Sequence, residues 1–267
     1  MKKIRLCVAG AGGKMGQEIV RTILKQEDML LVGASDTRHT GVDVGYAIGT
    51  SRIGLDMSGP LDTEMLRTSQ ADILVDFTNP QSVLKNAKLA IAEGIVPVIG
   101  TTGLDETDIA EIRESVDREK SGAFIAPNFA IGAILMMRFA QEAAKHFPNV
   151  EIIELHHDQK LDAPSGTALK TAEWISEVRK PMVQGHPNEY EKIQGARGGD
   201  VDGIHIHSVR LPGLVAHQEV LFGGLGQTLT IRHDAYSRET YMPGVMLAIR
   251  KALGLTSLVI GLENFLE

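Results

Sequence analysis

The sequence predicts an α/β protein: a Rossmann-type, doubly wound parallel sheet, followed by a second α+β domain with a mixed or antiparallel sheet. Three observations predict this fold. Short β-branched runs alternate with helical patterns in the first half, which is typical of βαβ crossovers. A glycine-rich turn, Gly10 to Gly16, separates the first such run from the first helical pattern. In the second half, three strand-like runs follow one another after a long Gly- and Pro-rich stretch.

The N-terminal half alternates expected strands with expected helices. Strands are expected at 4–9, 30–34, 72–77, 95–99 and 122–126, and helices near 14–26, 62–68, 80–93 and 105–119. Asn79-Pro80 and Asp105 are typical helix starts, because Asn and Asp cap helices and Pro fits the first turn. This alternation indicates a parallel sheet with helices on both faces.

The C-terminal half follows a different pattern. Helices are expected near 130–146, 167–179 and 239–253, and strands at 150–155, 204–211, 214–222 and 226–233. Residues 185–203 are expected to form a long loop, and loops of this length are usually functional or mobile. Pro212-Gly213 and Gly223-Gly224 are interpreted as hairpin turns. The change of pattern predicts a domain boundary close to Pro127-Asn128.

The bulk properties exclude several classes of protein. The formal charge is −7 over 267 residues and no basic block stands out, which argues against a nucleic-acid partner. No apolar run approaches about 18 residues, so no membrane span is expected. No signal peptide is evident, and the single Cys7 excludes an intrachain disulfide, so a cytoplasmic protein is expected. A small anionic ligand stays compatible with this charge, since a helix N-terminus and a few cations suffice to bind it.

The turn after the first strand is a candidate dinucleotide-binding loop. It comprises Gly10, Ala11, Gly12, Gly13, Lys14 and Met15. Glycines let the backbone approach a pyrophosphate, and the helix that follows directs its amides at the charge. The spacing departs from G-x-G-x-x-G, because Met15 takes the place of the third glycine and Gly16 comes one residue later. An ordinary tight turn is therefore the alternative interpretation.

Polar or small residues at the ends of later strands strengthen the cofactor interpretation. Asp36 follows the second strand, where a carboxylate can accept from ribose hydroxyls and favours NAD. Arg38 and His39 next to it could pair with a 2′-phosphate and favour NADP. The further candidates are Gly100, Thr101, Thr102, Ala126, Pro127, Asn128 and Phe129. Because ligands of open parallel sheets bind at the carboxyl ends of the strands, we expect NADH or NADPH there.

The segment from Glu154 to Ala168 is the candidate chemical site. His156 and His157 can exchange protons near neutrality, and Lys160 adds a cation. Ser165-Gly166-Thr167 lies at an expected helix start, where hydroxyls and unpaired amides suit a substrate carboxylate. Helix capping alone is the alternative interpretation of these three residues.

These motifs resemble those of the bacterial dihydrodipicolinate reductase family (4-hydroxy-tetrahydrodipicolinate reductases of lysine and diaminopimelate biosynthesis). The resemblance covers nearly the whole chain, and the block His-His-x-x-Lys-x-Asp-Ala-Pro-Ser-Gly-Thr is its most specific part. It implies reduction of 4-hydroxy-tetrahydrodipicolinate by NADH or NADPH with loss of water. It also implies a homotetramer, a dinucleotide-binding domain at 1–127 to which 241–267 returns, and a substrate-binding and oligomerisation domain at 128–240.

The resemblance implies a role for each residue of the chemical site. His156 would be the catalytic proton donor or acceptor, and Lys160 a second proton donor that helps water to leave. The substrate's carboxylates would be bound by His157, Ser165, Gly166, Thr167 and Arg238. Family members often carry Glu-Arg after the second strand, whereas this chain has Asp36-Thr37-Arg38, which leaves the choice between NADH and NADPH open.

Three other functions compete with this interpretation. A semialdehyde or sugar dehydrogenase would exchange hydride with an aldehyde or alcohol and omit the dehydration; an acyl-enzyme version needs a catalytic cysteine, and Cys7 lies in an apolar run. A nicotinamide-binding redox sensor would leave Lys160 without a role. A metal hydrolase could use the histidines at 156, 157, 205, 207, 217 and 233. No metal is expected, because these histidines have no clear carboxylate or cysteine partner.

Overall fold

The computed structural model describes residues 2–266. The contacts divide the chain into two compact units. Unit 1 comprises the residues up to Phe129 together with those from Tyr241 onward, and unit 2 is Ala130–Thr240.

Unit 1 contains a six-stranded parallel sheet with the order β11-β5-β4-β3-β1-β2. Its strands are β1 (Ile4–Ala9), β2 (Met29–Ser35), β3 (Ile73–Asp76), β4 (Val96–Ile99), β5 (Ala123–Ile125) and β11 (Leu258–Ile260). The chain starts in the middle of the sheet and builds outward in both directions, which confirms the predicted doubly wound fold. The short strand β11 was not predicted; it pairs in parallel with β5 at the sheet edge.

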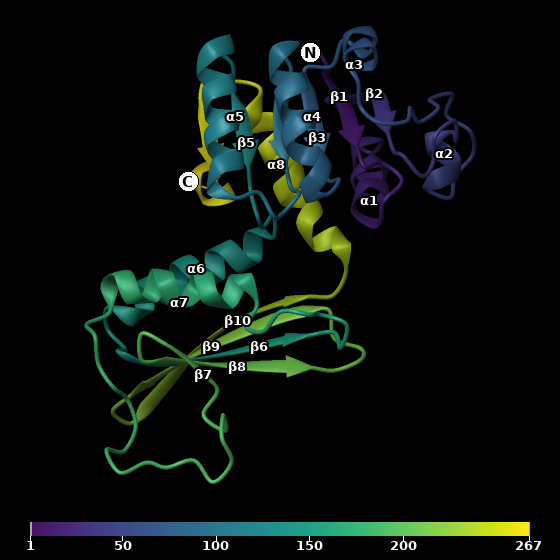
Figure 1. The fold of residues 1–267 in the computed structure, drawn as a ribbon. Helices are drawn as coiled ribbons and strands as arrows, with labels where there is room; N and C mark the ends of the chain where they lie inside the picture. Colours follow the sequence, from purple (N-terminus) through teal and green to yellow (C-terminus); the bar gives the residue numbers. More distant parts are fainter. Residues whose placement is uncertain (1, 267) are drawn as a thin grey trace. The chain divides into compact units, whose positions relative to one another are not determined.

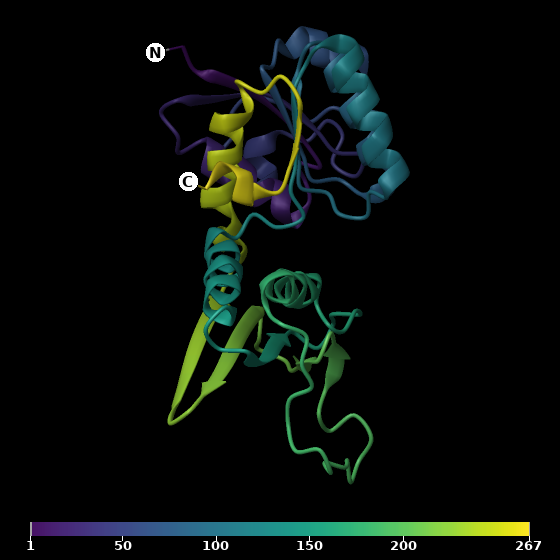
Figure 2. The same ribbon diagram turned by 90° about the vertical axis from the view of Figure 1, so that its left-hand side faces the viewer.

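Helices cover both faces of this sheet (Figures 1 and 2). They are α1 (Lys14–Ile23), α3 (Thr63–Ser69), α4 (Pro80–Ala92), α5 (Glu106–Glu119) and α8 (Met242–Ala252). One apolar cluster joins α4 and α5 to the sheet through residues such as Ile91, Ile99 and Ile112. The expected helix starts are confirmed: the Asn79 side chain accepts from the Gln81 amide, and Asp105 forms a capping box with Asp108.

Unit 2 contains a five-stranded mixed sheet with the order β10-β9-β6-β8-β7. Its strands are β6 (Asn149–His156), β7 (Gly199–Val201), β8 (Ile204–Arg210), β9 (Ala216–Gly224) and β10 (Gln227–Ala235). Strands β6 and β8 pair in parallel and the other neighbours pair antiparallel, which confirms the predicted mixed sheet. The helices α6 (Ile131–Ala144) and α7 (Gly166–Val178) lie side by side on one face of it (Figure 1).

The predicted hairpin turns of unit 2 need correction. Pro212-Gly213 is not a hairpin turn, because β6 lies between β8 and β9 and the connection crosses over it. Gly223-Gly224 belongs to β9, and the turn to β10 is Leu225-Gly226, with Gly226 at a φ of 70°. The expected loop at 185–203 contains β7, which pairs with β8 through Asp202-Gly203. Both turn residues have positive φ, as a two-residue hairpin requires.

Some short elements had no counterpart in the prediction. They are α2 (Val44–Ala47) and the 3₁₀ turn η2 (Leu262–Phe265). A further 3₁₀ turn, η1 (Arg238–Tyr241), precedes α8. The η1 turn and α8 together occupy most of the range predicted for the last helix.

Candidate active site

Glu154 is a fully buried carboxylate at the centre of unit 2. Side chains alternate along β6, so Glu154 shares the buried face with Val150 and Ile152. The Arg210 guanidinium donates to both Glu154 oxygens, with distances of 2.7 and 2.8 Å. Burial alone would raise the pKa of Glu154, but hydrogen bonds from Arg210, Ser208 and His156 outweigh it and lower that pKa. Glu154 is therefore ionised near neutral pH.

The His156 ring, which is 16% exposed, binds the other side of this carboxylate. Its Nδ1 lies 2.5 Å from Oε2 of Glu154. Burial lowers the pKa of His156 and Glu154 raises it, while the charges of Lys160 and Arg210 lower it further; the net direction is down. The neutral imidazole is thus favoured more than in an ordinary histidine, and a ring nitrogen that can gain or lose a proton suits a proton donor or acceptor.

Lys160 lies in the loop that follows β6. Its ammonium group donates to both oxygens of the exposed Asp162 carboxylate, at 2.7 and 2.8 Å. The backbone carbonyl of Asp162 also accepts a hydrogen bond from the Arg210 guanidinium, at 2.8 Å. Arg210 therefore connects the loop that carries Lys160 to the carboxylate that contacts His156.

The N-terminus of α7 completes this cluster. Ser165 is the N-cap, and its hydroxyl accepts from the Ala168 amide at 3.2 Å. The Ser165 amide donates to Oε1 of Glu154, also at 3.2 Å. Gly166 is exposed, and a Cβ added there would meet no atom within 4 Å. The first turn of the helix thus presents its positive end to open space, where an anion can approach.

The structure brings most, but not all, of the predicted substrate residues together. His156, Lys160 and Ser165 are connected through Glu154 and Arg210. Thr167 lies in the first turn of α7, and its carbonyl accepts from the Thr171 hydroxyl. His157 is exposed beside His156. Arg238 is exposed at the start of η1, and among the described residues no hydrogen bond connects it to the cluster.

Sequence reasoning did not assign a role to Glu154 or Arg210. The signal was present, however, in the alternation of two strands. Glu154 lies on the apolar face of β6 with Ile152. By the same alternation, Arg210 lies on the face of β8 that carries Ile204 and Ile206. A charged residue on the core-facing side of a strand needs a partner, and these two have opposite charges.

The glycine-rich turn of unit 1 connects β1 to α1. Gly10 has a φ of 78°, and a Cβ there would lie 2.5 Å from the Phe77 carbonyl. The amides of Gly10 and Ala11 donate to the Ser35 carbonyl, and the Gly13 amide donates to the Gly10 carbonyl. These amides stabilise the turn, so an anion at the start of α1 would face the first-turn amides, beginning at Lys14 and Met15.

Asp36 closes the turn from the end of β2. Its carboxylate accepts from the Gly12 amide at 3.1 Å and the Arg38 amide at 2.9 Å, and it contacts Nδ1 of His39 at 2.9 Å. Burial would raise the pKa of Asp36, but these bonds lower it overall. An ionised carboxylate in this place suits a ribose hydroxyl better than a phosphate. The Arg38 side chain is exposed next to it and can supply the opposite charge.

The ends of β3 and β4 are joined through the buried Asp76. Its carboxylate accepts from the Thr78 hydroxyl, the Thr101 hydroxyl and the Asn86 amide, at 2.7 to 2.8 Å. These bonds fix the strand ends beside a hollow of about 430 Å³, which is lined by Gly10, Gly12, Asp36, Arg38, Thr78, Lys85 and other residues. The hollow combines glycines, a carboxylate and cations, as a dinucleotide site requires.

The other predicted cofactor residues have different environments. Gly100 lies against the Phe77 ring, so that a Cβ there would come within 2.1 Å of it. Ala126 and Phe129 are buried, whereas Thr102 and Pro127 are exposed. The Asn128 side chain is half-buried at the end of unit 1.

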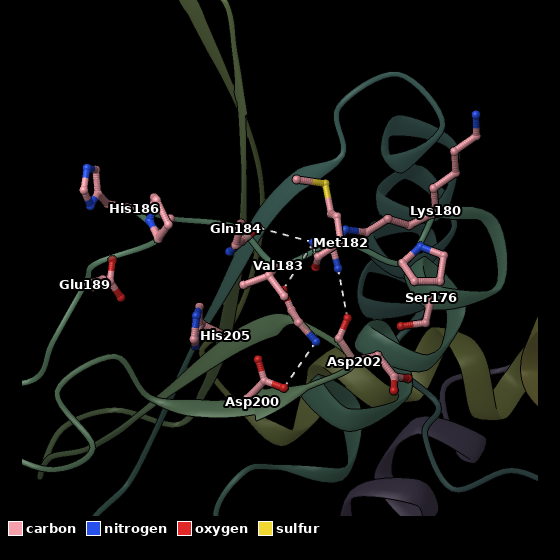
Figure 3. Close-up of a pocket in the computed structure, with 15 residues that line it drawn as sticks. Ser176, Lys180, Met182, Val183, Gln184, His186, Glu189, Asp200, Asp202 and His205 are labelled. Carbon is pink, nitrogen blue, oxygen red and sulfur yellow. Dashed lines mark hydrogen bonds between the residues drawn. The ribbon is translucent and has the colours of Figure 1, made fainter.

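A second hollow, of about 1240 Å³, lies in unit 2 between the end of α7, residues 180–189 and the hairpin of β7 and β8. Figure 3 shows Val183, Asp200 and His205 among the side chains that line it. None of the residues predicted to bind substrate or cofactor lines it. The Glu154 cluster, which contains the predicted catalytic side chains, therefore does not line this hollow.

The residues described in the structure form no group of three or more His, Cys, Asp or Glu side chains that could hold a metal ion. His207 instead contacts Glu151, and His217 contacts Asp234. Over the same residues, no helix is long and apolar enough to cross a membrane.

Comparison with known proteins identifies the family. The model of the dihydrodipicolinate reductase N-terminus matches residues 4–129, and that of its C-terminus matches residues 132–266. A 4-hydroxy-tetrahydrodipicolinate reductase of Desulfitobacterium hafniense is 77% identical over the full length of both chains, and one of Halalkalibacterium halodurans is 54% identical over 99% of this chain and 100% of that one.

Solved structures agree with this result. A dipicolinate-bound dihydrodipicolinate reductase from Paenisporosarcina sp. TG-14 superposes with a TM-score of 0.87 and 47% identity over 99% of this chain and 100% of that chain. An amine dehydrogenase from Mycobacterium smegmatis, at 14% identity and a TM-score of 0.65, shares the fold alone. The chain belongs to the dihydrodipicolinate reductase family.

Proposed function

We propose that this protein reduces 4-hydroxy-tetrahydrodipicolinate to tetrahydrodipicolinate with loss of water, using NADH or NADPH, in lysine and diaminopimelate biosynthesis. The observation that carries the proposal is the cluster in unit 2, in which one buried carboxylate contacts both the His156 ring and the N-cap of α7. Family membership over the whole chain supports the same activity.

The described residues of unit 1 fit a dinucleotide. The backbone at Gly10 has a positive φ and a Cβ there would meet the Phe77 carbonyl, so this position favours glycine. A Cβ at Gly12 would lie 2.2 Å from Nδ1 of His39, so the His39 side chain would have to move. The turn from Gly10 to Met15 would bind the pyrophosphate with the start of α1. Asp36 and Arg38 would contact the adenosine ribose. The strand ends would lie near the nicotinamide; they include Gly100, Thr101, Thr102, Ala126, Pro127, Asn128 and Phe129.

Cofactor preference rests on the same two residues. The ionised Asp36 favours the 2′-hydroxyl of NADH, while the exposed Arg38 can pair with the 2′-phosphate of NADPH. We infer that the enzyme accepts both.

The substrate carries two carboxylates, and unit 2 offers cations and helix amides to bind them. Ser165, Gly166 and Thr167 at the start of α7 would hold one carboxylate. His157 and Arg238 would contribute to binding, since each exposes a side chain that can donate to an anion. The two charges of the substrate thus select a dicarboxylate over a neutral heterocycle.

The residues divide the proton chemistry between them. Lys160 donates a proton to the departing 4-hydroxyl group, which leaves as water. The bound reduced nicotinamide supplies the hydride. Elimination of this water also releases one C–H proton from the ring, which offsets the proton given by Lys160. His156 would provide the proton that accompanies the hydride, so that overall substrate, NAD(P)H and one proton give product, NAD(P)⁺ and water. Holding the substrate in the reacting orientation supplies much of the acceleration.

The protein is further proposed to be a cytoplasmic homotetramer that assembles through the sheet of unit 2. The helices α6 and α7 cover one face of this sheet, and among the described residues of unit 2 no helix covers the other (Figure 1). Light scattering on the purified protein measures the assembly, and a mass of one or two chains would refute the tetramer.

The activity is tested by absorbance at 340 nm with each nucleotide, using substrate generated by the preceding synthase. We expect oxidation of NADH and NADPH that depends on this substrate. Aldehydes and secondary alcohols serve as controls, because turnover of those instead would indicate a simple dehydrogenase. Oxidation of neither nucleotide with the cyclic substrate would defeat the assignment.

A further inference from the structure

We propose that Glu154 is a positioning residue: its carboxylate, clamped by Arg210, holds the His156 ring with a proton on Nδ1 and leaves Nε2 to exchange the proton of the reaction. This inference deepens the proposed function and rests on it.

The geometry fixes the Glu154 carboxylate in one orientation. The side chain is 0% exposed and lies in a strand that is paired on both sides, with β8 and with β9. Oε1 accepts from Arg210 and from the Ser165 amide, whereas Oε2 accepts from Arg210 and contacts His156. Because Arg210, Ser208 and the Ser165 amide engage this carboxylate in addition to the imidazole, it cannot turn without breaking bonds inside the core.

This fixed carboxylate determines the tautomer of His156. The pKa of Glu154 is lowered, against the effect of burial, by Arg210, Ser208 and His156, so the group is an acceptor only. Nδ1 of His156 must therefore carry a proton. In the neutral ring, Nε2 then holds the lone pair, and in the charged ring Nε2 holds the transferable proton.

The charges around His156 come from three elements. Glu154 of β6 attracts the imidazolium, whereas Arg210 of β8 and Lys160 of the following loop repel it. The residue paired with His156 on β9 is the uncharged Ala216, and Asp162 is bound to Lys160. Glu154 is thus the acidic group that opposes burial and two cations, and its removal should make the ring harder to protonate.

The opposite face of β6 offers a matched comparison. Glu151 also contacts a histidine and an arginine, with Nε2 of His207 at 2.8 Å and the Arg197 guanidinium at 2.7 Å. Three positions along the strand from Glu154, it points to the other side of the sheet, away from α7. Glu151 thus repeats the residue types of the Glu154 cluster without a connection to the predicted catalytic residues.

The test measures the pKa of His156 directly by NMR in the full-length protein labelled in its nine histidines, with the His156→Gln variant to assign the signal. Glu154→Gln should lower the pKa of His156 by about one pH unit or more, because it removes an opposite charge in contact with the ring. Arg210→Gln should raise that pKa, since it removes a repelling charge. Both variants break the same ion pair, so a purely structural role would not shift the pKa in opposite directions.

Kinetics complete the test. Glu154→Gln should lower kcat by about 10-fold or more, but by no more than the ~10²–10⁴-fold that general acid–base catalysis contributes, with little change in the affinity for NADH. The limb of the kcat/KM profile that reports His156 should move to lower pH. Glu154→Asp, which keeps the charge on a shorter arm, should restore the pKa of His156 better than it restores kcat. Glu151→Gln should leave both readouts as in the wild type.

Three results would overturn the inference: a His156 pKa that is unchanged in Glu154→Gln, shifts of equal sign in the Gln variants of Glu154 and Arg210, or an equal effect of Glu151→Gln. The NMR measurement does not depend on turnover. A wild-type protein that binds nucleotide but does not oxidise it would defeat the proposed function, while the titration would still show whether Glu154 controls His156.

Discussion

At the scale of single residues, the candidate site is an arrangement of charges around one buried carboxylate. His156, Lys160 and Ser165 could be predicted as site residues because they lie close together in the 156–167 segment. Arg210 lies 56 positions from Glu154, and only strand pairing brings the two together. A sequence pattern can mark a charged residue on a core-facing position, but it does not say which other residue neutralises it.

Replacement of His156 by Gln tests its role as the proton carrier. We expect kcat to fall by ~10²–10⁴-fold, the usual contribution of a general acid or base, with little change in nucleotide affinity. Stopped-flow rates at 340 nm and fluorescence titration with NADH measure the two effects. A variant that keeps more than half of the wild-type kcat would remove His156 from the chemistry.

Substitution of Gly12 tests whether the glycine-rich turn binds the nucleotide. In Gly12→Ala the new methyl group would meet His39 at 2.2 Å and Asp36 at 2.9 Å, so the pocket must rearrange. Because His39 and Asp36 would have to leave the positions proposed for cofactor binding, we expect the Kd of NADH to rise by about 10-fold or more, which is a loss of ~1.4 kcal/mol of binding free energy. Gly254→Ala is the control, because a Cβ there meets no atom within 4 Å. Equal affinities in the two variants, measured by calorimetry, would contradict the assignment of the turn.

At the scale of elements, the parallel half was predictable and the mixed half was predictable only in part. Each of the strands β1 to β4 is followed by a helix of the same unit, so chain order and local pattern largely determine this part of the fold. In unit 2, Pro212-Gly213 has the composition of a hairpin turn, yet β8 and β9 pair on either side of β6. Local turn chemistry cannot report a strand that enters between two others. The hairpin at Asp202-Gly203 was missed, although Asp-Gly is a strong hairpin signal.

The N-cap of α7 should stabilise unit 2 and orient the helix start. Ser165→Ala removes the acceptor of the Ala168 amide, so we expect the free energy of unfolding to fall by about 0.5–2 kcal/mol. The KM for substrate should rise in the same variant. Ser176→Ala on the same helix is the control, because its buried hydroxyl has no hydrogen-bond partner among the described residues. Urea denaturation followed by Trp174 fluorescence compares them, and equal stability would argue against the cap.

At the scale of the whole molecule, the chain leaves unit 1 at Phe129 and returns to it at Tyr241. The returning segment was assigned to the first domain from the family resemblance alone. Its strand β11 is too short to give a clear hydrophobic pattern in the sequence. It contributes to the core through Leu262, which is fully buried, and through Phe265, whose ring stacks on Phe124 at 4.5 Å. Unit 1 therefore requires residues from both ends of the chain.

Leu262→Ala tests this dependence. Loss of a buried leucine side chain costs ~2–5 kcal/mol, so hydrogen exchange of the β5 and β11 amides should accelerate. Leu253→Ala, at a side chain that is 49% exposed, should change little. Unchanged exchange in Leu262→Ala would mean that the returning segment does not stabilise the sheet.

In the proposed reaction, hydride reaches C4 of the cyclic substrate and the 4-hydroxyl group is lost. Turnover with NADH that carries two deuteriums at nicotinamide C4, followed by mass spectrometry of the product, tests this claim most directly. The expected product has lost the 4-hydroxyl oxygen and gained one deuterium at C4. A product that retains that oxygen, or that contains no deuterium, would contradict it.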